Sequence, residues 1–382
     1  MGHKYILKLY DMELLHFDVV RNLAHPEVEI TWIDQDKTHL LPLGMEVSDK
    51  GLSEWISHRS IPRNRAYVGA LLAKCGLSMN RPMDIISVCR GLSLNDSYWV
   101  VTDSESRSFD ECNLYEHRLN RVLAWTAFTG YGSSSQRSLL SSPEFTTNGM
   151  LPKCWRRDEG KLLLFKGGTS GASNTGNEPF SEMYASQLGK EMDIDCTMYR
   201  IRKWKGMLCS SCEIFTGKDV AFVPVGRIVK TGGIQAVREY LQALGPDFLK
   251  QYRDMIVFDA IIYNTDRHFG NFGFLVDSHT NKIMAPAPLF DHGNSLFNLA
   301  GDFWESEGTI RNYAATLQPR VYDDFLEEAR SCMDHEMRQR LRHLLNFEFR
   351  KSGKWNYPEK KLQLMSQMVR ERIRMLVGAD NG

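Results

Sequence analysis

The sequence lacks several features that would place it in a narrow class of protein. Its 47 basic and 47 acidic residues give a formal net charge of zero, so neither a broadly basic nucleic-acid binder nor a polyanionic tail is indicated. No run approaches the roughly 18 apolar residues that span a bilayer, and the first residues carry charges throughout, unlike a signal peptide. Eight scattered cysteines show no dense disulfide framework. We expect a cytoplasmic protein, or one delivered by a route that the sequence does not show, without direct nucleic-acid or membrane binding.

The order of patterns along the chain separates a strand-rich part from a helix-rich part. The 382 residues allow two or three domains, and a Ser- and Gly-rich stretch near 130–144 is the best linker candidate. Short apolar runs predict strands at 151–156, 161–166, 197–204, 207–215 and 220–224. Helical periodicity predicts helices at 113–128, 234–244, 246–263, 320–333, 335–345 and 358–376. A strand pair at 272–276 and 283–290, flanked by polar loops, interrupts the helical part.

The strongest functional signal lies in the two polar loops around that strand pair. Asp266 and Asn271 are five positions apart on the first loop, and Asp291 opens the second loop two residues before Gly293. In phosphoryl transfer from ATP, one carboxylate accepts the proton of the attacking hydroxyl, while an amide oxygen and a second carboxylate hold Mg²⁺ against the phosphates. We therefore assign Asp266 as the base, and Asn271 and Asp291 as catalytic metal ligands. Turn and capping roles are the competing interpretation, which the ordered set disfavours.

A lysine at the end of an apolar strand is the next candidate. Lys166 closes the run at 161–166 and could reach the α- and β-phosphates of a nucleotide. Such a lysine needs a carboxylate partner from a following helix. Glu182, in the helix expected to start near Pro179, is our choice, and Glu178 is the alternative.

Two loops could cradle phosphate groups. Thr147, Asn148 and Gly149 precede the first strand of the hairpin, with Lys153 as a further phosphate contact. A second glycine-rich loop, at 167–176, precedes a helix N-terminus, where free N–H groups attract anions. Neither loop has the glycine spacing of a Walker A or G-x-G-x-x-G motif. We favour the first loop, and a surface loop is the simpler interpretation of the second.

These motifs together resemble the HipA-like serine/threonine kinases. The family's N-x-D-R-H-x-x-N pattern matches Asn264, Asp266, Arg267, His268 and Asn271, and its glycine loop S-x-x-G-x-x-P-K matches Thr146 to Lys153. Its metal-binding aspartate matches Asp291, and its ATP-contacting lysine matches Lys166. The resemblance implies an α+β, two-lobed protein-kinase-like fold, binding of ATP and Mg²⁺, and transfer to Ser or Thr hydroxyls of a protein substrate. It also places His268 among the nucleotide-binding residues. Many family members pair with a small DNA-binding antitoxin, as in toxin–antitoxin systems.

The resemblance also suggests a domain division and a modification site. We expect 1–132 to pack on or belong to the small lobe, 145–225 to form the nucleotide-binding small lobe, and 226–382 to form the helical catalytic large lobe. The family's loop serine is a modification site, and Thr146 stands at that position. We therefore expect autophosphorylation at Thr146 or Thr147, with the Ser-rich stretch Ser133–Ser142 as the alternative. A phosphate there would repel ATP.

Two other classes of function remain open from the sequence. The D-R-H-x-x-N loop also resembles that of phosphoinositide kinases, so a lipid or small-molecule kinase is an alternative. The absence of a polybasic run or a basic amphipathic helix favours a protein substrate. A non-catalytic binding module with a kinase fold is disfavoured because Asp266, Asn271, Asp291 and Lys166 are all present.

Overall fold

The computed structural model describes residues 4–132, 141–170 and 176–378. The chain forms two compact units: unit 1 comprises Met1–Lys166, Glu213–Val223 and Phe274–Met284, and unit 2 comprises Gly167–Cys212, Pro224–Gly273 and Ala285–Gly382. The expected linker and the second glycine-rich loop lie partly outside the described residues. The units follow contacts in space, so the predicted domain ranges, which follow the sequence, stay a prediction.

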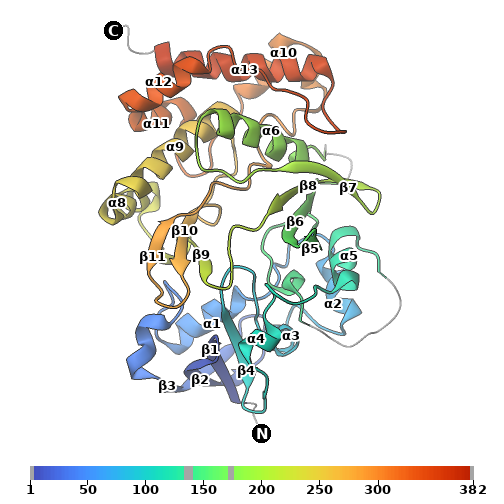
Figure 1. The fold of residues 1–382 in the computed structure, drawn as a ribbon, viewed down its shortest axis with the longest axis vertical. Helices are drawn as coiled ribbons and strands as arrows, with labels where there is room; N and C mark the ends of the chain where they lie inside the picture. The colour runs from blue at the N-terminus through green and yellow to red at the C-terminus, as the bar shows by residue number, and fades with distance from the viewer. Residues whose placement is uncertain (1–3, 133–140, 171–175, 379–382) are drawn as a thin grey trace. The chain divides into compact units, whose positions relative to one another are not determined.

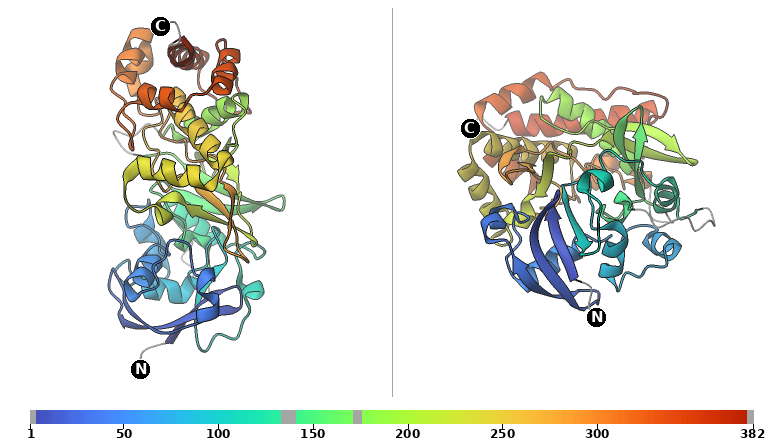
Figure 2. Two further views of the ribbon diagram at one scale, coloured as in Figure 1. Left: turned by 90° about the vertical axis from the view of Figure 1, so that its left-hand side faces the viewer. Right: turned by 60° about the horizontal axis from the view of Figure 1, so that its bottom comes forward.

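Unit 1 begins with an antiparallel sheet in the order β3-β2-β1-β4 (Figures 1 and 2). Its strands are β1 (Lys4–Leu9), β2 (Met12–Arg21), β3 (Glu27–Ile33) and β4 (Tyr98–Thr102). Side chains alternate between two cores along β1: Leu7 and Leu9 enter one, and Ile6 enters the other with Trp99. Both faces of β1 and β4 are covered, which hides the period of two along these two strands.

Short helices and a second hairpin complete unit 1. The helices are η1 (Gln35–Leu40), α1 (Asp49–Ser57), α2 (Val68–Lys74), α3 (Pro82–Cys89), α4 (Phe109–Cys112), α5 (Arg121–Thr129) and η2 (Pro143–Phe145). The predicted hairpin forms from β5 (Lys153–Asp158) and β6 (Lys161–Gly167). Glu159 and Gly160 turn it with φ of 49° and 80°. A further three-stranded sheet, mainly in unit 1, has the order β11 (Ile283–Pro286), β10 (Gly273–Asp277), β9 (Val220–Pro224).

Unit 2 is built around a buried central helix. This helix, α9 (Pro246–Ile262), buries most of its last two turns, including Phe258. The helices α11 (Phe325–Cys332) and α13 (Glu359–Val377) contact it, and α12 (His335–His343) packs on α13 (Figure 1). The remaining elements are α6 (Glu178–Glu191), β7 (Arg200–Trp204), β8 (Met207–Glu213), α7 (Val225–Ile228), α8 (Gly233–Leu244), η3 (Gly301–Glu305) and α10 (Glu307–Ala314). Among the described helices, none is long and apolar enough to cross a membrane.

Two predicted helices begin later than expected because polar side chains cap the backbone at another place. The helix expected from residue 113 starts at Arg121. Asn113 accepts hydrogen bonds from the N–H groups of Tyr115 and Glu116, and Asn120 caps the helix itself. The helix expected from residue 320 starts at Phe325, where Asp324 accepts the N–H groups of Leu326 and Glu327, both at 2.8 Å.

Candidate active site

The catalytic loop, residues 264–271, follows directly from α9. The helix ends where Tyr263 adopts a left-handed conformation with φ of 55°. Asn264 then donates to the Asp259 carboxylate at 2.8 Å, and its own oxygen accepts the N–H of Asp266 at 3.2 Å. The last turn of a buried helix therefore fixes the start of the loop.

A fully buried arginine ties this loop to the second polar loop. Arg267 forms two hydrogen bonds with Asp259, at 2.8 and 3.0 Å. It also donates to the carbonyls of Asn271 and Phe290, at 2.9 and 2.8 Å, and to Nδ1 of His292 at 3.2 Å. Burial lowers the pKa of Arg267, but the Asp259 carboxylate outweighs it, so that the pKa lies above its ordinary value. We call this set the Arg267 anchor. It holds Asn271 and the residue before Asp291 in one place.

The proposed base has both carboxylate oxygens engaged. Oδ2 of Asp266 accepts a hydrogen bond from Asn294 at 3.1 Å, and Oδ1 forms an ion pair with Arg320. Asn298 donates to Asn294 in turn, at 3.2 Å. The carboxylate therefore has a defined orientation, set by two segments that follow Asp291 in the chain.

Asp291 lies in a strained turn. Its φ of 62° is in the left-handed region, which a residue with a side chain adopts at a cost of about 1–2 kcal/mol. The Asp291 N–H donates to the Tyr199 hydroxyl at 3.2 Å, and the Tyr199 ring meets His292 edge-on. Burial raises the pKa of Tyr199 well above its ordinary value, and the Glu182 and Asp291 carboxylates add to the effect. Tyr199 therefore stays a neutral hydroxyl beside these carboxylates.

Asn271 and Asp291 fit the donor set that Mg²⁺ takes. Asn271 is buried, and its backbone makes two hydrogen bonds, accepting from Arg267 and donating to the His268 carbonyl. An amide and a carboxylate oxygen suit Mg²⁺, which uses few protein ligands and completes its shell with phosphates and water. Within the described ranges, no group of three or more His, Cys, Asp or Glu gathers as a metal site.

Two glutamates of α6 lie beside the Asp291 turn. A Cβ atom placed on Gly293 would lie 3.3 Å from Glu178 Cβ and 3.9 Å from Glu182 Oε1. Glu178 accepts the N–H of Thr169 at 3.1 Å, and Glu182 accepts the hydroxyl of Ser210. Both carboxylates are buried. Glu182 therefore lies next to the predicted metal-binding turn, within the same unit.

His268 is held as a neutral hydrogen-bond donor. Its Nδ1 accepts the N–H of Gly270 at 3.0 Å, which leaves the proton on Nε2 in the neutral ring. Burial lowers the pKa of His268, while the Asp266 carboxylate acts in the opposite direction. Gly270 has no room for a side chain, because a Cβ would lie 2.8 Å from His268 Cε1.

The phosphate loop, residues 146–153, belongs to unit 1 and is closed by its own lysine. Lys153 is buried, and its Nζ donates to the Asn148 carbonyl at 2.7 Å. Gly149 has φ of +96°, and a Cβ there would lie 2.2 Å from Lys153 Nζ. The backbone conformation favours glycine at this position, and a side chain there would displace the end of Lys153. Asn148 and Gly149 themselves are exposed.

A second buried arginine holds this loop. Arg65 pairs with Glu144 at 3.2 Å and donates to the carbonyls of Glu144, Thr147 and Lys153 at 2.8, 3.2 and 2.7 Å. Burial lowers the pKa of Arg65 and raises that of Glu144. We call this set the Arg65 anchor. It fixes both ends of the phosphate loop.

The two candidate phosphate-binding lysines face each other across the hairpin. Lys153 and Lys166 are directly opposite in the antiparallel register, so their side chains leave the same face of the strands. Both are buried. Lys166 belongs to unit 1 and Glu182 to unit 2, and their pairing stays a prediction.

Sequence reasoning missed several residues that position the predicted ones. They are Arg65, Asp259, Tyr199, Asn294 and Arg320. Only Asp259 carried a signal, because it lies on the helix that runs into the motif. Asn294 lies three residues after Asp291 in the second polar loop, whereas Arg65, Tyr199 and Arg320 come from distant segments and belong to no motif.

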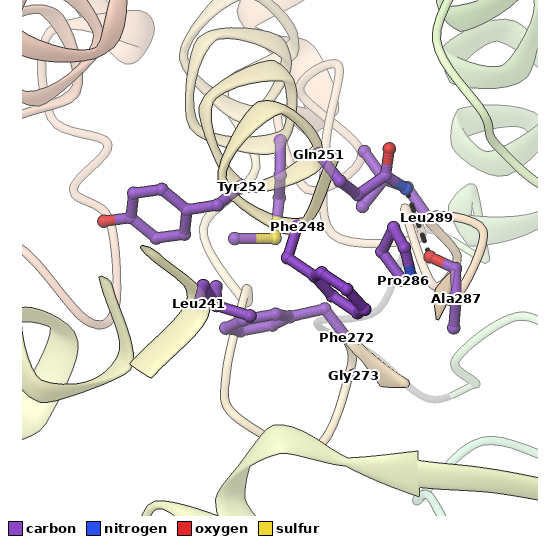
Figure 3. Close-up of a pocket in the computed structure, with 10 residues that line it drawn as sticks. Leu241, Phe248, Gln251, Tyr252, Phe272, Gly273, Pro286, Ala287 and Leu289 are labelled. Atoms are coloured by element: carbon purple, nitrogen blue, oxygen red, sulfur yellow. Dashed lines mark hydrogen bonds between the residues drawn. The ribbon is translucent and has the colours of Figure 1, made fainter. Parts of the chain in front are cut away.

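A pocket in unit 2 does not supply a nucleotide site. Figure 3 shows it between α8 and α9 and the chain around Phe272 and Ala287, with Gln251 donating to the Ala287 carbonyl at 3.1 Å. Its lining is mostly apolar, and its volume of about 10 Å³ has room for about one water molecule. It is a packing gap.

Comparison with known proteins agrees with these motifs. No family model matches the chain. Over 140 residues the chain is 28% identical to the serine/threonine-protein kinase CtkA of Helicobacter pylori, which covers 33% of this chain and 43% of that protein. The chain thus spans less than half the length of this curated relative. The crystal structure of Helicobacter pylori CtkA matches 59% of this chain and 93% of its own at 16% identity, with a TM-score of 0.45.

A full-length match defines the fold. The HipA protein of Shewanella oneidensis, solved in complex with HipB and its operator DNA, covers 98% of this chain and 97% of its own at 13% identity, with a TM-score of 0.56. The chain therefore has an α+β fold of the kinase type. More particularly, its fold is similar to that of HipA, as the motifs predicted, and part of its sequence is related to a serine/threonine-protein kinase.

Proposed function

We propose that the chain is an ATP- and Mg²⁺-dependent kinase that transfers a phosphoryl group to serine or threonine hydroxyls of protein substrates. The Arg267 anchor is the observation that supports this most strongly. It holds Asn271 and the Asp291 turn to the loop that carries Asp266, all within unit 2. A kinase needs a base, an amide and a carboxylate in one place, and a buried bidentate ion pair keeps them there.

The chain's own residues carry the transfer as follows. Asp266 accepts the proton of the acceptor hydroxyl. At the same time the hydroxyl oxygen forms a bond to the γ-phosphorus, and the bond between that phosphorus and the ADP oxygen breaks. Asn271 and Asp291 would hold Mg²⁺, which supplies positive charge to the phosphate oxygens. His268 presents a neutral N–H donor on the same loop.

Unit 1 would supply the phosphate contacts. Lys153 and Lys166 bring two buried ammonium groups to one face of the hairpin. The exposed backbone of Asn148 and Gly149 adds N–H donors. We propose that Lys166 contacts the α- and β-phosphates and that Glu182 orients it.

Autophosphorylation belongs to this proposal as a form of self-control. Thr146 is buried, and its hydroxyl donates to the Leu92 carbonyl at 2.8 Å. The hydroxyl of Thr147 donates to Pro143 at 2.7 Å and accepts Trp155 Nε1 at 2.9 Å. A phosphate on either threonine would break these bonds, so a modified loop could not keep this conformation. The alternative stretch Ser133–Ser142 lies mostly outside the described residues.

The structural comparison also suggests a class of partner to test. The Shewanella protein was solved with HipB and operator DNA, and that assembly concerns that protein. For this chain, we propose a small DNA-binding antitoxin as a candidate partner. Co-purification of the chain from its own cells, followed by mass spectrometry, would identify such a protein.

Phosphate transfer is the test of the proposed function. The chain is incubated with labelled ATP, a mixed protein and peptide pool and a lipid extract, with Mg²⁺ or with EDTA. Intact mass and peptide mapping locate the phosphate. We expect Mg²⁺-dependent label on serine or threonine in the wild type. Asp266→Asn and Asp291→Asn should lose at least about a thousandfold in rate, or ~4 kcal/mol in barrier.

The matched control is Asp277→Asn. Asp277 caps the β10–β11 turn by accepting the N–H groups of His279 and Thr280, at 2.9 and 2.8 Å, and has no catalytic role in this account. Its variant should transfer at the wild-type rate. Label only on lipid would replace the protein-kinase proposal with the lipid-kinase alternative. Undiminished transfer by a folded Asp266→Asn variant would refute the assignment of the base.

A further inference from the structure

Arg320 reaches the proposed base from outside every recognised motif. It lies between α10 and α11, in a segment that was expected to be helical. Its guanidinium pairs with Oδ1 of Asp266, while Asn294 donates to Oδ2. A cation is thus in direct contact with the carboxylate that would accept the substrate proton.

The backbone on the C-terminal side of Arg320 is anchored. Asp324 caps α11, and the Tyr322 ring packs edge-on against Phe325 at 6.1 Å between centroids. The Tyr322 hydroxyl is buried and finds no hydrogen-bond partner among the described residues. Burial raises its pKa well above the ordinary value, and the Asp259 charge adds to this. Tyr322 therefore stays neutral and packed, two residues from Arg320.

The pair is too exposed to contribute much to stability. The side chains of Arg320 and Asp266 are 55% and 30% exposed. Ion pairs in water at such exposure contribute about 0–1 kcal/mol. The effect of Arg320 is therefore expected on the chemistry at Asp266 more than on folding.

The distances needed for transfer bring Arg320 close to the transferred phosphoryl group. An acceptor oxygen must lie about 2.6–3.2 Å from Asp266 to lose its proton there. The phosphorus it attacks must lie about 3–3.5 Å from that oxygen. A guanidinium that touches Asp266 is then within one side-chain rotation of the phosphoryl oxygens, and its fork of five N–H groups can contact carboxylate and phosphate together.

We propose that Arg320 is a further catalytic residue, which orients Asp266 and supplies positive charge to the phosphoryl group during transfer. This rests on the proposed function. The side chain that contacts Asp266 as a cation is that of Arg320, which lies outside the catalytic loop. Arg320 thus acts from a separate segment, as a stabilising arginine does in other phosphotransferases.

The test compares Arg320→Ala and Arg320→Lys with Arg311→Ala. Arg311 is a matched control, because its side chain is 48% exposed and pairs with Glu307 and Glu371 away from Asp266. We expect kcat of Arg320→Ala to fall about a hundredfold or more. The KM for ATP should change less than about threefold, since the contact forms in the transition state. Arg320→Lys should recover part of the rate, and added guanidinium should raise the rate of Arg320→Ala but not of Arg311→Ala.

The outcomes separate this inference from the proposed function. Absence of any Mg²⁺-dependent transfer by the wild type would reject the proposed function. Wild-type transfer with an equal or faster rate for Arg320→Ala would reject only the role of Arg320. If Arg320→Ala folds poorly, Arg320→Lys decides. Full activity would show that charge alone suffices and would overturn the role given to the guanidinium fork, whereas partial activity supports it.

Discussion

The phosphate loop of unit 1 and the catalytic loop of unit 2 are both held by a buried arginine, but the two anchors are balanced differently. Arg267 and Asp259 form two short hydrogen bonds, and the net effect raises the pKa of the arginine. Arg65 meets Glu144 through one contact of 3.2 Å, and burial prevails, lowering the pKa of the arginine and raising that of the glutamate.

The difference suits what each loop would do. Metal ligands and a base must keep fixed positions, because small displacements of reacting groups cost large factors in rate. A loop that covers ATP must open to admit it, and such loops come from the less stable parts of a protein. We therefore expect the Arg267 anchor to be the stronger of the two.

Removal of each arginine should show the largest effect. Arg267→Met would leave the Asp259 carboxylate buried without its cation, and we expect the free energy of unfolding to fall by about 3–5 kcal/mol. Arg65→Met should cost less, about 1–3 kcal/mol, because Glu144 can take up a proton. Denaturant unfolding, followed by fluorescence and circular dichroism, measures both. Equal losses would remove the contrast between the anchors.

The pH dependence of the Arg65→Met variant sharpens the same contrast. Burial raises the folded-state pKa of Glu144, so the folded protein binds this proton more tightly than the unfolded chain does. Stability from this group is therefore present at low pH and is lost as the pH rises through the folded-state pKa. Without Arg65 that pKa rises further, and the stability deficit of Arg65→Met should shrink between pH 8 and pH 5. A deficit that grows on acidification would contradict this.

Nucleotide affinity should depend on the opposed lysines. Lys166→Ala and Lys153→Ala should each weaken ATP binding by about 1.5–3 kcal/mol, because each removes a charged hydrogen bond to phosphate. Lys161→Ala is the matched control, since Lys161 opens the same strand but pairs with Glu213 at the surface at 2.6 Å. Calorimetric titration measures all three. Similar ATP affinities for Lys166→Ala and Lys161→Ala would show that Lys166 does not contact the nucleotide.

The smallest effect should come from substitution of Gly149, which lies against the end of the Lys153 side chain. Gly149→Ala introduces a left-handed alanine and a Cβ 2.2 Å from Lys153 Nζ, so we expect about 1–2 kcal/mol of strain together with weaker ATP binding. Gly160→Ala has a similar backbone conformation, φ of +80°, but no atom within 4 Å of its Cβ. It should share the strain and keep the affinity. Equal ATP affinity in both variants would show that Lys153 does not act through Gly149.

The sequence predicted those parts of the fold that local signals define. The helices α8, α9 and α13 agree with the predicted ranges within one or two residues, because glycine or proline stands at their starts. The β5–β6 hairpin and the two polar loops were also found. In each case the chain signals its own structure over a few neighbouring residues.

The parts that were missed depend on contacts between distant residues. The sheet of β1 to β4 was not predicted, because its strand β4 lies about ninety residues after β1 in the chain and both faces of β1 and β4 are covered. Arg65 holds a loop some eighty positions away, and Arg320 reaches Asp266 from fifty-four positions on. Nothing in the local pattern distinguishes such arginines from surface residues.

The central claim is that Asn271 and Asp291 bind Mg²⁺ against ATP in the place that the Arg267 anchor defines. Calorimetric titration of ATP, with Mg²⁺ and with EDTA, tests it in the wild type and in Asp291→Asn. We expect Mg²⁺ to tighten ATP binding by about tenfold or more in the wild type, or ~1.4 kcal/mol, and by less than about twofold in the variant. The same Mg²⁺ dependence in both proteins, or no binding of ATP by the wild type, would contradict the account.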